Sequence, residues 1–172
     1  MSLLSIILGS RSDLAVYQEA NAPQLLEQLR LAEGTDVSVV SAHRNRRELE
    51  AHCLRMLNDG VIVFCCIAGM SAALPGEVAA ITNGQRLVIG VALPSRERPD
   101  ARDATEAMIR MPAGTPVLCS GVGKSGIVNG ILAAAQCIAY DSSTTAEALH
   151  DYRETTNPKP AFGINLPAEI LK

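Results

Sequence analysis

The chain has 172 residues, 48% of them hydrophobic and 19% charged, the balance expected of a globular domain with a sizeable core. Its net charge is −3 and only 3% of its residues are aromatic, so neither a nucleic acid nor an anionic membrane is a predicted partner. The apolar run at 3–8 is too short to span a bilayer and follows no basic leader. No membrane anchor or secretory leader is therefore predicted.

The cysteines are odd in number and form no Cys-x-x-Cys pair: Cys53, Cys65, Cys66, Cys119 and Cys137. All lie in apolar segments, so we expect buried, reduced thiols and a cytoplasmic location. No arrangement of Cys and His has the spacing of metal ligands, and no metal is predicted.

Short apolar runs predict strands at 3–8, 37–40, 61–66, 87–92 and 117–119. These runs are continuously apolar rather than alternating, which indicates strands covered on both faces. Helices are predicted at 12–32 with a restart at Pro23, 46–57, 74–81, 104–110, 125–139 and 145–155. The helix at 125–139 is apolar almost all round, so we expect it to be buried in the protein or in a subunit interface.

The alternation of strands and helices predicts an α/β fold, a three-layer αβα sandwich with an open parallel sheet of the flavodoxin-like or Rossmann-like kind. We expect residues 1–172 to form a single domain. The last part of the chain, from about 141 to 172, would form a C-terminal helix and a tail whose apolar residues pack on a neighbouring subunit.

Ligands of open α/β sheets bind beyond the carboxyl ends of the strands, so the segments that follow the predicted strands matter most. The first is Gly-Ser-Arg-Ser-Asp at 9–13. Ser12 and Asp13 could simply cap the next helix. Alternatively, backbone amides and the Ser10 hydroxyl bind a phosphate, while Asp13 accepts hydrogen bonds from a ribose.

The second segment, Ser-Ala-His-Arg at 41–44, ends a valine-rich strand. Arg44 suits a phosphate because its planar guanidinium donates paired hydrogen bonds, and His43 can exchange a proton near neutral pH. The alternative is a loop histidine bonded to a carbonyl, beside an arginine in a surface ion pair. His52 and His150 are not predicted to be catalytic.

The segment after the last strand, Ser-Gly-Val-Gly-Lys-Ser-Gly at 120–126, contains a Gly-x-Gly-x-x-Gly pattern. That dinucleotide fingerprint belongs in the first strand–helix unit, and a P-loop would need a glycine where Leu118 stands. We interpret the segment as a close-packed strand-to-helix turn.

Taken in chain order, several segments resemble the AIR carboxylase family of purine biosynthesis, which includes the N-carboxyaminoimidazole ribonucleotide mutases. The resemblance covers about residues 3–155 and rests on GSRSD, VVSAHR, IAGMSAALPGEVAA, IGVAL, MPAGTPV and GKSGIVNGILAAAQ. It implies a homo-octamer with sites at subunit junctions, a ribonucleotide and carbon dioxide as small-molecule partners, and no metal or organic cofactor.

The resemblance also implies roles for individual residues. His43 would be catalytic, handling the proton at the ring carbon that gains or loses the carboxylate, and Ser10, Asp13 and Arg44 would hold the ribose phosphate. Arg44 resembles the mutase branch, because the branch that uses free carbon dioxide typically has Lys there. The full set of expected substrate-binding residues is Gly9, Ser10, Ser12, Asp13, Ser41, Arg44, Ala68, Gly69, Met70, Ser71 and Leu74.

The loop after the third strand departs from the family. It usually reads Ala-Gly-Ala-Gly-Gly-Ala-Ala-His-Leu-Pro-Gly, whereas residues 68–76 read Ala-Gly-Met-Ser-Ala-Ala-Leu-Pro-Gly. The second histidine is missing, and Met70 and Ser71 replace a glycine pair. This departure leaves two alternatives open: a ribonucleotide-binding paralogue without catalysis, or a carboxylase of another heterocycle such as a nicotinate nucleotide, with a cysteine such as Cys119 as nucleophile.

Overall fold

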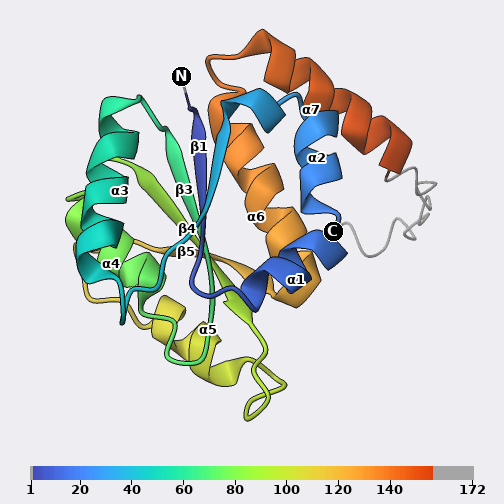
Figure 1. Ribbon diagram of the computed structural model, residues 1–172. Coiled ribbons are helices and arrows are strands. Elements are labelled where there is room, and N and C mark those ends of the chain that lie inside the picture. Colours follow the sequence, from blue (N-terminus) through green and yellow to red (C-terminus); the bar gives the residue numbers. More distant parts are fainter. Residues whose placement is uncertain (1, 157–172) are drawn as a thin grey trace, which may run out of the picture.

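A computed structural model describes residues 2–156, in which a parallel sheet lies between two layers of helices (Figure 1). The sheet has five strands: β1 (Leu4–Leu8), β2 (Thr35–Val39), β3 (Val63–Gly69), β4 (Leu87–Leu93) and β5 (Leu118–Val122). Their order across the sheet is β2-β1-β3-β4-β5. The predicted αβα sandwich is confirmed, and its strand order is the flavodoxin-like one.

The helices divide into two groups that cover opposite faces of the sheet (Figure 1). One layer contains α1 (Asp13–Glu19), α2 (Ala22–Gln28), α6 (Gly123–Ile138) and α7 (Ser143–Thr156), with a short 3-10 turn, η1 (Ala32–Gly34), before β2. The other contains α3 (Arg46–Asn58), α4 (Leu74–Ile81) and α5 (Arg102–Ile109). The chain winds outward in both directions from β1 and β3, so these two neighbouring strands lead to helices on opposite faces.

The core is built on the alternation of side chains along the central strands. In β1, Leu4, Ile6 and Leu8 pack against the α6 layer, whereas Ile7 packs against the α3 layer, and all four are fully buried. Full burial of one such side chain contributes about 1.5–3 kcal/mol. Strand β1 is therefore held firmly near the centre of the sheet by side chains on both of its faces.

The predicted helices are confirmed with small shifts at their ends. The predicted helix at 74–81 coincides with α4, and the predicted restart at Pro23 separates α1 from α2. The break lies at Asn21, whose φ of 53° is left-handed and cannot continue a right-handed helix. Helix α5 begins at Arg102, ahead of the predicted start at 104.

The prediction that all strands are covered on both faces is wrong for the two edge strands. Val37 and Val39 of β2 are 42% and 43% exposed. Within residues 2–156, β2 pairs with β1 alone and forms one edge of the sheet, where these two side chains stay exposed. Strand β5 is an edge strand too, and it runs to Val122, beyond the predicted end at 119.

Strand β5 passes directly into α6, as a close-packed turn requires. Gly121 has a φ of +125°, and a Cβ on Gly126 would lie 2.6 Å from the carbonyl carbon and oxygen of Gly121. Only glycine fits this approach. The residues of α6 that face the sheet are buried, while Gln136 and Cys137 are exposed, so the helix is not covered all round within one subunit, and its burial in a subunit interface stays a prediction.

The expectation of buried thiols is confirmed for three of the five cysteines. Cys53, Cys65 and Cys66 are buried, Cys119 is half-buried and Cys137 is exposed; all five are free. Burial raises the pKa of both the Cys53 and the Cys65 thiol to about 12. The cytoplasmic location stays a prediction, and the predicted tail beyond Thr156 lies outside the described residues.

Candidate functional site

The carboxyl ends of β1, β2, β3 and β4 open into one cavity of about 620 Å³, within the range that small-molecule sites occupy. It lies at the point where the strand order reverses, the usual ligand site of such sheets. Every predicted site residue lines it: Gly9, Ser10, Ser12, Asp13, Ser41, His43, Arg44, Ala68, Gly69, Met70, Ser71 and Leu74.

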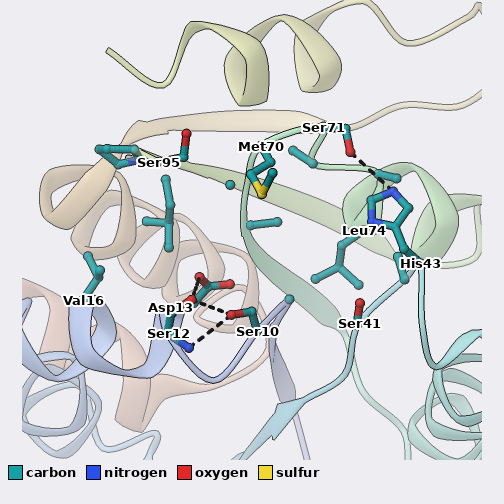
Figure 2. A pocket seen from close by; sticks show the side chains of 18 of the residues that line it. Ser10, Ser12, Asp13, Val16, Ser41, His43, Met70, Ser71, Leu74 and Ser95 are labelled. Atoms are coloured by element: carbon teal, nitrogen blue, oxygen red, sulfur yellow. Dashed lines mark hydrogen bonds between the residues drawn. The ribbon is translucent and has the colours of Figure 1, made fainter. Parts of the chain in front are cut away.

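The loop from β1 to α1 forms a compact hydroxyl and carboxylate cluster (Figure 2). Ser10 Oγ accepts a hydrogen bond from the Ser12 amide at 3.1 Å, and the Ser10 and Ser12 hydroxyls form a hydrogen bond with each other. Ser12 Oγ donates in turn to Asp13 Oδ1 at 3.3 Å. Ser12, the N-cap residue of α1, makes no side-chain cap bond, whereas the Ser10 hydroxyl holds the Ser12 amide at the start of the helix. The capping interpretation therefore fails for Ser12 and holds in part for Ser10.

The Asp13 carboxyl sits in a partly dehydrated environment. Burial raises its pKa, and hydrogen bonds from Ser12 and from the backbone of Ser10 and Gly9 oppose this to a smaller extent. A Cβ on Gly9 would lie 3.5 Å from Asp13 Oδ2, so the carboxylate turns back toward the Gly9–Ser10 turn at the cavity wall. It is thus an acceptor suited to a sugar hydroxyl.

The loop from β2 to α3 is anchored at both ends. The Val40 amide donates to the Leu8 carbonyl at 2.9 Å, and the Asn45 amide donates to the Ser41 carbonyl at 2.8 Å. Ser41 is buried, whereas His43 and Arg44 are exposed at the cavity. The strand end therefore presents the imidazole and the guanidinium from a short, tied turn.

The loop from β3 to α4 has an unusual backbone. Met70 and Ala72 have φ angles of 57° and 38°, in the left-handed region that side chains other than glycine rarely adopt. Met70 is 59% exposed. Ser71, between these two residues, places its Oγ 3.4 Å from His43 Nε2 (Figure 2).

The loop from β4 to α5 supplies a fourth wall that sequence reasoning did not include. Leu93, Pro94, Ser95 and Arg96 all line the cavity. The signal was present, because Leu-Pro-Ser-Arg directly follows a predicted strand. The rule that located the other three segments would have located this one.

The cavity carries more positive than negative groups. Arg44 and Arg96 line it and, within residues 2–156, neither forms an ion pair, while Asp13 is the carboxylate among the lining residues. Guanidinium groups left without a partner suit phosphate and carboxylate. The site can thus bind an anion that also carries hydroxyl groups.

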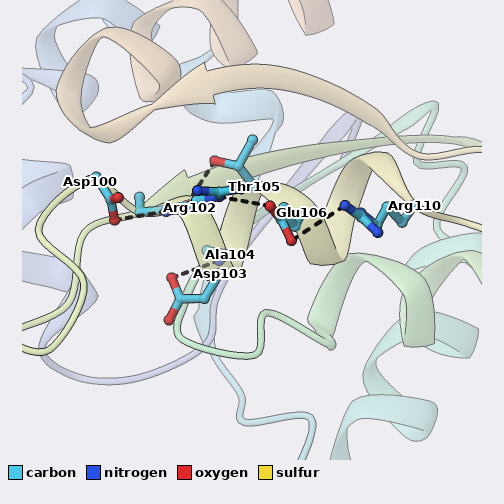
Figure 3. A network of polar contacts seen from close by, with 8 residues as sticks. Asp100, Arg102, Asp103, Ala104, Thr105, Glu106 and Arg110 are labelled. Atoms are coloured by element: carbon cyan, nitrogen blue, oxygen red, sulfur yellow. Dashed lines mark hydrogen bonds and ion pairs between the residues drawn. The ribbon is translucent and has the colours of Figure 1, made fainter.

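A second hollow lies beside α5 and is lined by Arg98, Arg102, Asp103 and Glu106. Polar contacts along the helix engage several of these groups (Figure 3). Glu106 accepts from Arg102 at 2.8 Å and lies 3.7 Å from Arg110. The Asp100 and Asp103 carboxylates accept backbone amides at the start of the helix. This cluster is a solvated helix face with a structural role.

No group of three or more His, Cys, Asp and Glu residues among residues 2–156 is arranged to hold a metal ion. In the same range, no helix combines the length and the apolar character needed to cross a bilayer.

Comparison with known proteins places the chain in a family. The sequence model of the AIR carboxylase family matches residues 3–159 of this chain. The chain belongs to the AIR carboxylase family. The resemblance inferred from the strand-end segments is therefore confirmed.

Two curated relatives have similar identity to this chain but differ in how much of their own length it matches. The N5-carboxyaminoimidazole ribonucleotide mutase of Bacillus subtilis is 34% identical over 154 residues, 90% of this chain and 91% of that protein. The probable N5-carboxyaminoimidazole ribonucleotide mutase of Methanothermobacter thermautotrophicus is 36% identical over 148 residues, 86% of this chain. The match spans only 41% of that longer relative.

Among solved structures, PurE of Treponema denticola superposes with a TM-score of 0.72 at 22% identity, covering 90% of this chain and 91% of that one. At this identity the likeness concerns the fold. It agrees with the flavodoxin-like sheet described above.

Proposed function

We propose that the protein is an N5-carboxyaminoimidazole ribonucleotide mutase, which moves a carboxylate between the exocyclic amine and a ring carbon of an aminoimidazole ribonucleotide. One observation carries the proposal: side chains from separate strand ends, Ser10, Asp13, His43 and Arg44, line a single cavity. The named activity of the relatives supplies the substrate class.

The two ends of the substrate would meet different walls. Arg44 and Arg96 supply guanidinium groups for the phosphate and the carboxylate. Asp13, held by Ser12 and the turn at Gly9, supplies the acceptor for ribose hydroxyls. The exposed His43, the one histidine among the described residues that line the cavity, then faces the heterocycle.

The reaction needs one proton carrier and no net proton. His43 as imidazolium protonates the amine nitrogen as its bond to the carboxylate breaks and carbon dioxide is released. The ring carbon then forms a bond to that carbon dioxide, and neutral His43 removes the proton which this carbon carried. Histidine suits both steps because it exchanges protons near neutral pH.

We expect the chain to form a homo-oligomer whose sites lie at subunit junctions, with the octamer of the family as the expected form. The exposed Val37 and Val39 leave an apolar strip on the uncovered face of β2, which a second copy could bury. Analytical ultracentrifugation of the full chain tests this, and a stable monomer at micromolar concentration would contradict it.

The central experiment follows the ultraviolet absorbance of carboxyaminoimidazole ribonucleotide as the enzyme converts it. Turnover by the wild-type protein and none by His43→Asn is the expected result. Tight calorimetric binding of aminoimidazole ribonucleotide without any turnover would instead favour a binding paralogue. The strained backbone at Met70 and Ala72, in the loop that lacks the second histidine of the family, gives that second function its specific motivation.

The nicotinate alternative has less support. A cysteine nucleophile would have to reach the bound ring, and no cysteine is among the described residues that line the cavity. Cys119 lies on β5, at the edge of the sheet. Intact-mass analysis after incubation with a nicotinate nucleotide should detect no covalent adduct.

A further inference from the structure

We propose that Ser71 is the positioning residue of His43: its hydroxyl holds the imidazole in the orientation from which His43 carries the proton. The inference rests on the proposed function, since it concerns the proton step of that reaction. It assigns to the divergent loop a part in catalysis.

His43 needs to be held in one orientation to carry a proton. Its side chain is exposed at the cavity rim, and an exposed imidazole rotates freely unless it is tethered. Within residues 2–156, the Ser71 hydroxyl is the hydrogen-bond partner found for this ring, with 3.4 Å between Ser71 Oγ and His43 Nε2. Catalytic hydrogen bonds of ligand-free sites are often this long and shorten when substrate binds.

Ser71 is itself held in place by its loop. Its neighbours Met70 and Ala72 have left-handed φ angles of 57° and 38°, each of which costs about 1–2 kcal/mol for a residue with a Cβ. Ala72 is buried in the core, and its amide donates to the Gly69 carbonyl at 3.1 Å. Leu74, 2% exposed, fixes the start of α4 just beyond.

A hydroxyl is chemically suited to hold an imidazole that changes its protonation state. Ser71 can donate to an unprotonated Nε2 and can equally accept from a protonated one. A carboxylate in its place would favour the imidazolium, and a guanidinium would favour the neutral ring. A hydroxyl favours neither strongly, so it can hold Nε2 while the other ring nitrogen, Nδ1, gives the proton to the substrate and takes it back.

The kinetic test compares Ser71→Ala with Ser71→Thr, which keeps the hydroxyl. A positioned general acid or base contributes about 10²–10⁴-fold, and loss of its orientation alone should lower kcat by about tenfold while KM changes less than about twofold. Ser71→Thr should recover most of kcat. Ser125→Ala, on an exposed position of α6 outside the cavity, controls for removal of a serine hydroxyl.

A second readout needs no turnover. Solid-state 15N NMR of histidine-labelled, ligand-free protein reports the two ring nitrogens of each histidine. Ser71→Ala should shift the Nε2 signal of His43 and broaden it, Ser71→Thr should retain it, and the signals of His52 and His150 should not move.

The two readouts separate this inference from the proposed function. If the wild-type protein shows no turnover, the proposed function fails, and the NMR comparison still decides whether Ser71 holds the ring. An unchanged kcat in Ser71→Ala overturns the inference, as does a raised KM alone, which would make Ser71 a substrate contact. A lowered kcat with unchanged His43 signals overturns it as well.

Discussion

Two histidines of this chain occupy opposite environments. His43 lies exposed at the cavity, with a single long hydrogen bond to a hydroxyl. His52, on α3, is 7% exposed and bonded at both ring nitrogens, to Ser5 Oγ at 3.0 Å and to Arg55 at 3.1 Å. Asp36 lies 3.6 Å from its Nε2.

The partners of His52 decide its protonation. Arg55 can only donate, so Nδ1 of the ring must accept, and Nε2 carries the hydrogen of a neutral imidazole. Burial is the largest cause of its lowered pKa; Arg55 adds to the lowering, and Asp36 opposes it. The buried, well-bonded histidine is therefore fixed in one state, whereas a proton carrier needs access and two states. The many contacts of His52 thus indicate a structural role, whereas the exposed His43 is the candidate for proton transfer.

The substitution His43→Asn is the strongest test of this contrast between the two histidines. We expect kcat to fall by at least about 10²-fold because the proton carrier is lost, while calorimetric affinity for aminoimidazole ribonucleotide changes little. The denaturation midpoint should stay at the wild-type value, since the side chain is exposed. A variant with full activity would remove His43 from the mechanism.

His52→Ala should have the opposite pattern. It removes a buried ring and leaves Ser5 without its partner, so the free energy of unfolding should fall by about 2–3 kcal/mol. The kcat of the remaining folded protein should stay near the wild-type value. Denaturant titration at one fixed protein concentration measures this; His150→Ala, on an exposed position, is the matched control and should change stability by less than about 0.5 kcal/mol. A loss of kcat without a loss of stability would reverse the assignment of the two histidines.

The lowered pKa of His52 predicts a direction for the pH dependence of stability. Because the unfolded chain binds a proton near the ordinary value of 6.5 and the folded chain only at lower pH, stability is retained above about 6.5 and falls as the pH drops below it. The difference in unfolding free energy between wild type and His52→Gln should shrink over this acidic range. A difference that grows on acidification would mean that the pKa is raised instead.

The smallest effect concerns the loop that holds Ser71. Met70→Gly should raise the free energy of unfolding by about 0.5–1 kcal/mol, because glycine adopts the φ of 57° without strain, and the exposed side chain buries little. Met70→Ala keeps the Cβ and should show no such gain. Equal stability of the two variants in thermal unfolding would show that the backbone is not strained at this position.

Much of this architecture can be predicted from the sequence because it depends on the local pattern of apolar and polar residues. Continuous apolar runs such as Leu4–Leu8 predict buried strands, and Pro75 marks the start of α4 within its first turn. The rule that ligands bind at the carboxyl ends of parallel strands then places Ser10, His43 and Met70 at one cavity before any coordinates are known.

The tertiary structure alone decided what depends on residues far apart in the chain. Valines of β2 look identical to buried ones in the sequence, yet Val37 is exposed because its strand lies at the sheet edge. Likewise, only packing brings Ser71 to His43 and Ser5 to His52. Local composition determines which element forms and which way its side chains alternate; which neighbour each side chain meets, and hence its hydrogen bonds and protonation, depends on how distant segments pack.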